Sequence, residues 1–221
     1  MKDKIYTWLK TIMVFLLFFI LPDIPMLFGI DVTKFSDTNY FIYRFIMSLG
    51  YILILIACYH ETLTRDFKKL KSNISDNIDM AIKYWLPGFL VMIISNAIII
   101  FIFGLGLSGN EESIRDIVAI SPLYMFFSAS LYAPFTEELI FRKSFRDVIK
   151  NPIIYVLSSG FIFGFLHVMG YVNVPIDWIH LIPYCSLGFA FALLYYKSDN
   201  IYLSMIMHFA HNTFALLLMF L

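Results

Sequence analysis

Long apolar runs constrain the fold of this sequence more than any other feature. Seven runs are each close to the length, about 20 residues, that a helix needs to cross the hydrocarbon core of a bilayer. They occupy 8–30, 40–60, 84–107, 119–141, 152–172, 176–196 and 199–221. Because backbone N–H and C=O groups must pair internally in lipid, such runs form helices. The sequence therefore predicts an all-α, polytopic transmembrane helix bundle of about seven spans, within a range of six to eight.

Composition supports this fold class. Hydrophobic residues make up 60% of the 221 residues and charged residues only 14%, which is too apolar for a soluble domain of this length. The first run lacks a small-residue cleavage site, so we expect it to remain as an anchor. Pro22, Asp23 and Pro25 interrupt its outer end, which should be kinked or unwound. A net charge of zero gives no indication of a nucleic-acid partner.

Basic residues are distributed unequally between the two sides of the predicted spans. Of the 16 lysines and arginines, only Lys34, Arg44 and Arg115 fall on the outer side. Short cytoplasmic loops carry the excess of basic residues in membrane proteins. The N-terminus is therefore predicted to be cytoplasmic, and an odd number of spans would place the C-terminal end outside.

Three charged residues stand together in the fourth run, where charge is costly. Glu137 and Glu138 are followed by Arg142, and ionisable residues at membrane depth are candidates for function. Residues four apart share a helix face, so Arg142 can pair with Glu138. Neighbouring residues diverge by about 100° around a helix, which leaves Glu137 without a partner in its own helix.

Two further polar pairs lie on later runs. Phe163 and His167 are four apart in the fifth run, and His208 and Asn212 are four apart in the seventh. At a rise of 1.5 Å per residue, Glu137, His167 and His208 lie about 20, 22 and 14 Å from the inner ends of their helices. With ordinary helix tilt, the three side chains can share one layer near the middle of the membrane.

This combination of residue types suits hydrolysis. Glu137 with His167 could take a proton from water, and His208 with Asn212 could offer N–H donors to an oxyanion. Pro134 should free a backbone carbonyl near Ser130, which could line a wet cavity. We therefore expect a catalytic cavity within the membrane, facing the cytoplasm.

The three motifs resemble those of a known family. Glu137-Glu138-xxx-Arg142, Phe163-xxx-His167 and His208-xxx-Asn212 occur in this order on successive apolar helices. They look like the motifs of the CPBP family (CAAX proteases and bacteriocin-processing enzymes, also called Abi), which includes the type II CAAX prenyl endopeptidase. Lys143 departs from the pattern, because many members have glycine there, and this puts the helix packing at that position in doubt.

The resemblance implies an intramembrane endopeptidase. Glu137 and His167 would activate water, His208 and Asn212 would stabilise the oxyanion, and Glu138, Arg142 and Phe163 would support the site. The chain would divide into N-terminal transmembrane helices at 1–118, with three spans and a basic inner loop, and a catalytic helix core at 119–221. The expected partners are the lipid bilayer and a membrane-associated peptide or protein tail. Abundant Ile, Lys, Asn, Phe and Tyr suggest a bacterial cytoplasmic membrane.

A metal-dependent alternative uses the same residues. Glu137, His167 and His208 could bind zinc and leave one position open for water. The sequence has no HExxH motif, and asparagine is a poor zinc ligand. We therefore expect no cofactor and favour the metal-free mechanism.

Other interpretations remain for the protein and for single residues. The protein could be a non-catalytic bacteriocin-immunity or peptide-binding protein of the same fold, or a small transporter with a proton relay, although no inverted repeat is visible. His208 and Asn212 could simply bond helices together. His180 and Asp177, next to Trp178, are typical of an anchor at the membrane interface.

Overall fold

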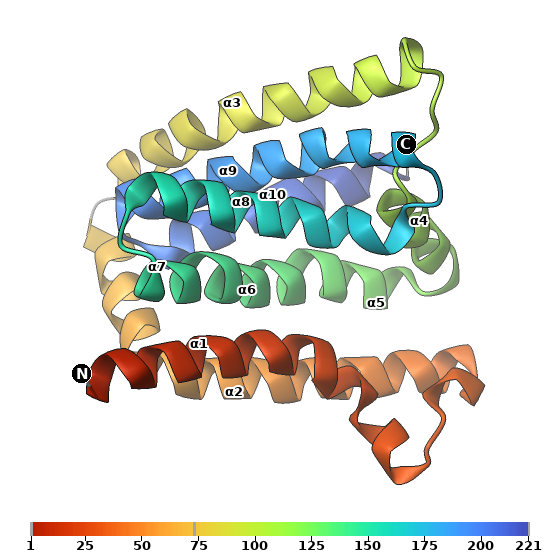
Figure 1. Ribbon diagram of the computed structural model, residues 1–221, viewed down its shortest axis with the longest axis horizontal. Coiled ribbons are helices and arrows are strands. Elements are labelled where there is room, and N and C mark those ends of the chain that lie inside the picture. Colours follow the sequence, from red (N-terminus) through yellow and green to blue (C-terminus); the bar gives the residue numbers. More distant parts are fainter. Residues whose placement is uncertain (1, 73, 221) are drawn as a thin grey trace.

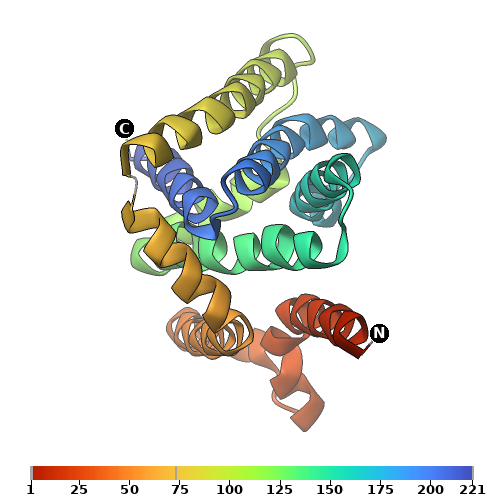
Figure 2. The same cartoon turned by 90° about the vertical axis from the view of Figure 1, so that its left-hand side faces the viewer.

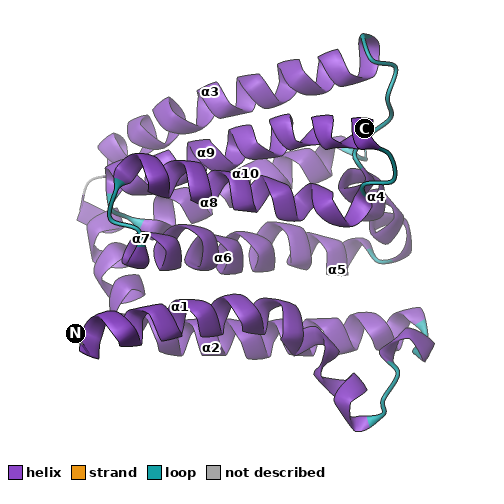
Figure 3. Ribbon diagram, in the orientation of Figure 1, coloured by secondary structure: helices purple, strands orange, loops and turns teal. Residues whose placement is uncertain are grey.

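The computed structural model describes residues 2–72 and 74–220, and all regular structure within these ranges is helical, with no strand. The predicted ranges also include Met1, Asn73 and Leu221, which lie outside the described residues. Figure 3 shows helices joined by short loops. The predicted all-α class is confirmed.

Six segments of the described chain are long and apolar enough to cross a membrane. They are built on α1 (Lys2–Ile20), α2 (Asp37–Ser72), α3 (Ile74–Phe101), α8 (Pro152–Val168), α9 (Leu181–Ser198) and α10 (Ile201–Leu218). This number lies within the predicted six to eight, and the protein is a multi-pass integral membrane protein. The unwinding expected after α1 is also present, because the 3-10 helix η1 (Leu21–Phe28) contains both prolines.

The fourth predicted run is helical but irregular. After the short helix α4 (Gly109–Ile120), the chain breaks at Ser121 and continues as α5 (Pro122–Phe126), η3 (Phe127–Tyr132), α6 (Ala133–Glu137), η4 (Glu138–Ser144) and α7 (Phe145–Val148). Both η3 and η4 are π-helical. Together with the six regular segments, this interrupted helix takes residues 2–72 and 74–220 along the bundle seven times, and the first and last of these residues lie at opposite ends of it (Figure 1).

The helices form layers. In Figures 1 and 2, α1 and α2 lie together on one side, α3 lies on the opposite side, and the remaining long helices lie between them. Within this arrangement α9 packs most extensively against α8 and α3. The polar motifs predicted on the fourth, fifth and seventh runs therefore belong to the inner layers.

Small residues allow α8 and α9 to approach closely. A Cβ added to Gly188 of α9 would lie 2.5 Å from the backbone oxygen of Gly160, and one added to Gly164 would lie 2.8 Å from the nitrogen of Cys185. Glycines spaced by four residues, like Gly160 and Gly164, are typical of close helix packing in membranes. This contact fixes α8, and with it Phe163 and His167, against the bundle.

The basic segment that was predicted as an inner loop is helical at 61–72 and at 74–83. Helix α2 bends at Tyr59, whose φ and ψ of −126° and 15° are not helical, and then continues to Ser72. Asp66 on this extension is fully buried and accepts a hydrogen bond from the backbone N–H of Ile201, at 2.9 Å. The extension therefore fixes the start of α10, the helix that carries His208.

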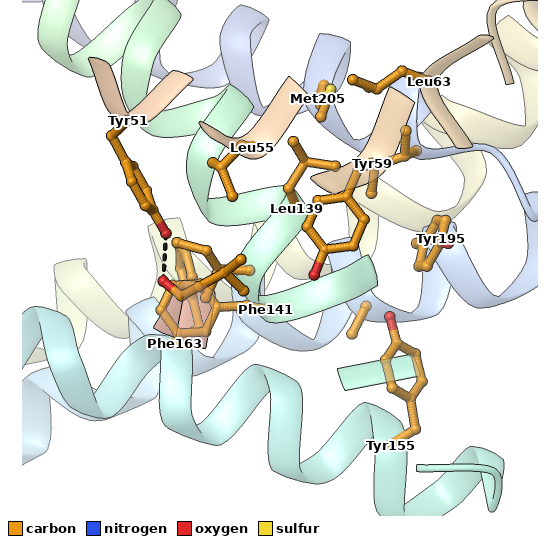
Figure 4. Packing of buried hydrophobic residues seen from close by; sticks show 14 residues of the cluster. Tyr51, Leu55, Tyr59, Leu63, Leu139, Phe141, Tyr155, Phe163, Tyr195 and Met205 are labelled. Atoms are coloured by element: carbon orange, nitrogen blue, oxygen red, sulfur yellow. Dashed lines mark hydrogen bonds between the residues drawn. The ribbon is translucent and has the colours of Figure 1, made fainter. Parts of the chain in front are cut away.

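The main hydrophobic core joins α1 and α2, through η4, to α8, α9 and α10. Figure 4 shows Tyr51, Leu55 and Tyr59 of α2 facing Leu139 and Phe141 of η4. The hydroxyl of Tyr59 lies 2.9 Å from Ser144 Oγ. The first two helices thus cover the segment that carries the Glu-Glu-Arg motif.

Candidate active site

The predicted pairing of Glu138 with Arg142 is present in the structure. Arg142 Nε donates to Glu138 Oε2 at 3.1 Å, and both side chains are fully buried. Arg142 Nη1 also donates to Ser159 Oγ at 3.0 Å, and the guanidinium lies 4.7 Å from the centre of the Phe163 ring. A buried arginine requires such partners, because an unpaired charge in a membrane interior is costly. The motif arginine therefore ties η4 to α8.

Glu138 also reaches the third motif. Its second oxygen, Oε1, lies 3.0 Å from Nδ1 of His208 on α10. The carboxylate of Glu138 is thus shared between Arg142 and His208. This arrangement holds the His208 ring in one orientation, with Nε2 as its remaining polar atom.

Glu137 lies beside the same histidine but is not bonded to it. Glu137 is only 9% exposed, and its Oε2 has no hydrogen-bond partner in the described part of the chain. The nearest recorded group is His208 Nε2, 3.8 Å from Oε2, which is beyond hydrogen-bond range. As predicted, this carboxylate has no partner in its own helix.

His167 has a defined tautomer. Its Nδ1 lies 2.8 Å from the backbone oxygen of Phe163, and because a carbonyl only accepts, Nδ1 must carry the hydrogen. When the imidazole is neutral, Nε2 then has a free lone pair. The ring also stacks on Tyr184 of α9, with 5.2 Å between ring centres.

Phe163 connects the three motifs. Its ring centre lies 4.4 Å from that of His167 and 5.8 Å from that of His208, and Arg142 lies over its face. No contact recorded in the described residues joins Glu137 directly to His167. The three motifs therefore meet around one aromatic ring. His167 and His208 each contact the Phe163 ring, and no contact between the two histidines is recorded in the described residues.

Asn212 bonds to the irregular fourth helix. Its Nδ2 donates to the backbone oxygen of Ala129, at 2.8 Å. In η3 the hydrogen bonds run from each N–H to the oxygen five residues earlier, as from Ala133 to Ser128. In that pattern Pro134 would pair with Ala129 but has no N–H. The freed carbonyl expected near Ser130 is thus that of Ala129, and Asn212 supplies its donor.

The described residues do not form the donor set of the zinc alternative. That alternative needs Glu137, His167 and His208 to converge on one point. Within the residues that the structure describes, no three His, Cys, Asp or Glu side chains are grouped closely enough to hold a metal ion. We derive no catalytic step through a metal.

A cavity of about 190 Å³ adjoins His167. Its walls come from the loop before α4, the start of α4, and the short 3-10 helices η5 (Met169–Tyr171) and η6 (Pro175–His180). These segments lie at the end of the bundle away from the N-terminus (Figure 1). The N-terminus and this cavity therefore lie at opposite ends of the bundle. If the N-terminus is cytoplasmic, this cavity does not open to the cytoplasm.

Several residues of this region differ from the sequence-based expectations. His180, expected in an interfacial anchor, is only 7% exposed and lines the cavity. Lys143 fits into the helix packing by pairing with Asp147 and approaching the Tyr59 ring. Ser159 and Tyr184 were not predicted as neighbours of the site. Neither residue belongs to the three motifs, and Tyr184 carries no local signal in the sequence.

The fold and the candidate site together define the class of this protein. It is a multi-pass helical membrane protein with a buried network of Glu, Arg and His side chains. Residues 119–214 match the family model described as type II CAAX prenyl endopeptidase Rce1-like. Over these residues the chain is similar to that family, as the three motifs predicted.

Curated relatives point in the same direction. Putative membrane peptidase YdiL of Bacillus subtilis (strain 168) is 29% identical over 182 residues, which cover 79% of this chain and 68% of the relative. UPF0177 protein YvdC of Lactococcus lactis subsp. lactis (strain IL1403) is 26% identical, covering 93% of this chain and 77% of the relative. No solved structure matches the chain significantly.

Proposed function

We propose that this protein is an intramembrane endopeptidase that hydrolyses a peptide bond in a membrane-associated peptide or protein tail. The observation that carries the proposal is Glu137, a buried carboxylate with an unpaired oxygen beside a histidine fixed by Glu138. Support also comes from the Rce1-like match and from the relative named as a membrane peptidase.

In the proposed reaction, Glu137 acts as the general base. A water molecule attacks the carbonyl carbon of the peptide bond while Glu137 takes one of its protons. His167 orients the water through the lone pair on Nε2, since Nδ1 carries the ring hydrogen. The C–N bond then breaks, and the proton held by Glu137 passes to the leaving amine.

We assign oxyanion stabilisation to His208 and Asn212. His208 donates the hydrogen on its Nδ1 to Glu138 Oε1. It can therefore offer a second N–H, on Nε2, only as an imidazolium. Two carboxylates, one guanidinium and one imidazolium sum to zero charge, which suits a buried site. Asn212 uses one of its two amide N–H groups on Ala129 and keeps the other.

The remaining assignments follow from the same scheme. We propose that 119–221 supplies the catalytic core and that 1–118 covers it, supported by the contacts of α1 and α2 with η4 and α6. We propose a metal-free reaction, because the scheme uses only side chains. A bacterial cytoplasmic membrane is supported by the bacterial sources of the relatives.

The test is cleavage of a library of lipid-anchored peptides by the full chain in nanodiscs. Removing a general base lowers the rate by about 10²–10⁴-fold, so Glu137→Gln and His167→Ala should each lose most of the activity. Glu111→Gln is the matched control, because Glu111 pairs with Arg115 outside the candidate site.

The library experiment also separates the alternatives. A chelator should leave the rate unchanged, whereas inhibition that zinc reverses would overturn the metal-free reaction. If folded wild-type protein cleaves no peptide in a broad library, the endopeptidase proposal fails and the non-catalytic immunity or peptide-binding function replaces it.

A further inference from the structure

We infer that the cavity beside His167 is a subsite for a positively charged group of the substrate, a Lys or Arg side chain near the bond to be cut. This inference rests on the proposed endopeptidase function. It concerns residues outside the three motifs, chiefly Glu112, Asp177 and His180.

The size of the cavity suits one side chain. Pockets that bind a whole small molecule are typically about 300–1,000 Å³, whereas this cavity holds about 190 Å³. His167 forms part of its wall. A substrate whose reacting bond lies at the candidate site would thus have a neighbouring side chain within reach of the cavity.

The charge of the lining favours a cation. Eleven residues line the cavity, and they include the carboxylates of Glu112 and Asp177 but no lysine or arginine. The start of α4 also contributes to the wall, and a helix N-terminus carries only about half a positive charge. Two full negative charges outweigh it, so the cavity attracts cations and repels a carboxylate.

The carboxylates differ in their availability. Asp177 Oδ2 accepts the backbone N–H groups of Asn173 and Val174, at 2.8 and 3.0 Å. Its other oxygen has no recorded hydrogen bond in the described part of the chain. Glu112 is exposed, and its side chain makes no recorded hydrogen bond or ion pair there either. Both groups can therefore accept from a guanidinium or an ammonium.

An independent observation comes from His180. Its ring is buried, lines the cavity, and has a buried Nδ1 without a hydrogen-bond partner in the described residues. Both Glu112 and Asp177 lie within electrostatic range of this ring. Buried polar atoms are nearly always bonded, so an unpaired ring nitrogen in a polar cavity indicates a place for a ligand.

The test compares arginine with citrulline, which has nearly the same shape but no charge. Lipid-anchored peptides carry one or the other at successive positions, and the full chain is held in nanodiscs of neutral phosphatidylcholine. Wild type should cleave the arginine peptide about tenfold better in kcat/KM at one position. Glu112→Gln should lower that ratio by about two- to fivefold, the range of an exposed ion pair. Glu111→Gln, whose carboxylate lies outside the lining, should leave the ratio unchanged.

A binding measurement keeps the inference independent of catalysis. Fluorescence anisotropy of the same peptides with the Glu137→Gln variant should show the same preference for arginine, weakened when Glu112→Gln is added. Charge-dependent binding without cleavage by wild type would support the subsite and remove the endopeptidase proposal. Equal cleavage and binding of both peptides at every position, or a preference that Glu112→Gln does not change, would overturn the subsite.

Discussion

The carboxylate of Glu138 is buried between two partners on different helices, Arg142 on η4 and His208 on α10. Each of its oxygens has one of these partners. The side chain therefore links the two helices, forming a joint between them, as well as neutralising the charge of Arg142. Removing one member of a buried ion pair is costly because the other charge stays behind without compensation. At the scale of single residues, Glu138 should therefore contribute more than Glu137 to the stability of the fold.

The first prediction concerns this joint. Glu138→Gln keeps the shape of the side chain but leaves the guanidinium of Arg142 without its counter-charge, so the free energy of unfolding should fall by about 3–5 kcal/mol. Reversible unfolding in detergent measures this change. Glu111→Gln removes a carboxylate from the partly exposed pair with Arg115 and should cost at most about 1 kcal/mol. Equal losses in the two variants would contradict the buried joint.

A second prediction concerns Asn212 and Pro134, which compensate for one another across two helices. Asn212→Ala removes the donor to the Ala129 carbonyl and should lower the free energy of unfolding by roughly 0.6–1.7 kcal/mol, the range for such bonds in membranes. Pro134→Ala restores a backbone N–H that can serve the same carbonyl. In the Pro134→Ala background the loss from Asn212→Ala should therefore be smaller, and a double-mutant cycle measures the difference. The same loss in both backgrounds would refute the compensation.

At the scale of elements, the close contact of α8 with α9 positions the second motif. The two helices meet at glycines, and Gly160 has no room for a Cβ, which would lie 2.7 Å from the backbone nitrogen of Phe189. Backbone atoms cannot yield as a flexible side chain does. The distance between α8 and α9 is thus set by the glycines at their contact, which have no side chain to hold the helices apart.

The third prediction follows from this contact. Gly160→Ala should force the helices apart and lower the free energy of unfolding by about 1–3 kcal/mol. Gly170→Ala is the matched control, since a Cβ there meets nothing within 4 Å. Thermal unfolding of the two variants provides the comparison. If Gly160→Ala is as stable as Gly170→Ala, the close contact does not limit the packing.

At the scale of the whole molecule, the cavity lies at the end of the bundle away from the N-terminus. The distribution of lysine and arginine predicts a cytoplasmic N-terminus. A cytoplasmic N-terminus would place the opening of the cavity on the outer side of the membrane.

A fourth prediction tests this topology by labelling single cysteines in intact cells with a membrane-impermeant maleimide. Glu112→Cys should react from outside, whereas Lys4→Cys should react only after the cells are opened. Both positions are exposed in the structure. Cys58 and Cys185 are half-buried and buried, and their background is measured in the unmodified chain. Labelling of both new cysteines from the same side would exclude an odd number of membrane crossings between residues 4 and 112.

The sequence predicts the helical class and the Glu138–Arg142 pair because both depend on local spacing. It places Glu137 and His208 in one layer of the membrane, but it does not predict the contact of His208 with Glu138, since that contact joins residues 70 positions apart and depends on how α10 packs. The cavity was also missed, because its wall combines segments that carry no common motif. Asn212 was predicted as a site residue, but its bond to Ala129 depends on a π-helical segment that periodicity does not reveal.

The two π-helical segments also determine where the chain can tolerate insertions and deletions. A π-helical turn holds about one residue more than an α-helical turn, so deleting one residue from 127–132 would return that segment toward an α-helix and leave Glu137 facing α10. A deletion in α6 has no such outlet and would rotate Glu137 by about 100° relative to the residues before it. In an alignment of proteins that keep this site, single-residue gaps in the stretch from η3 to Arg142 should therefore fall within the π-helical segments and not in α6 between them.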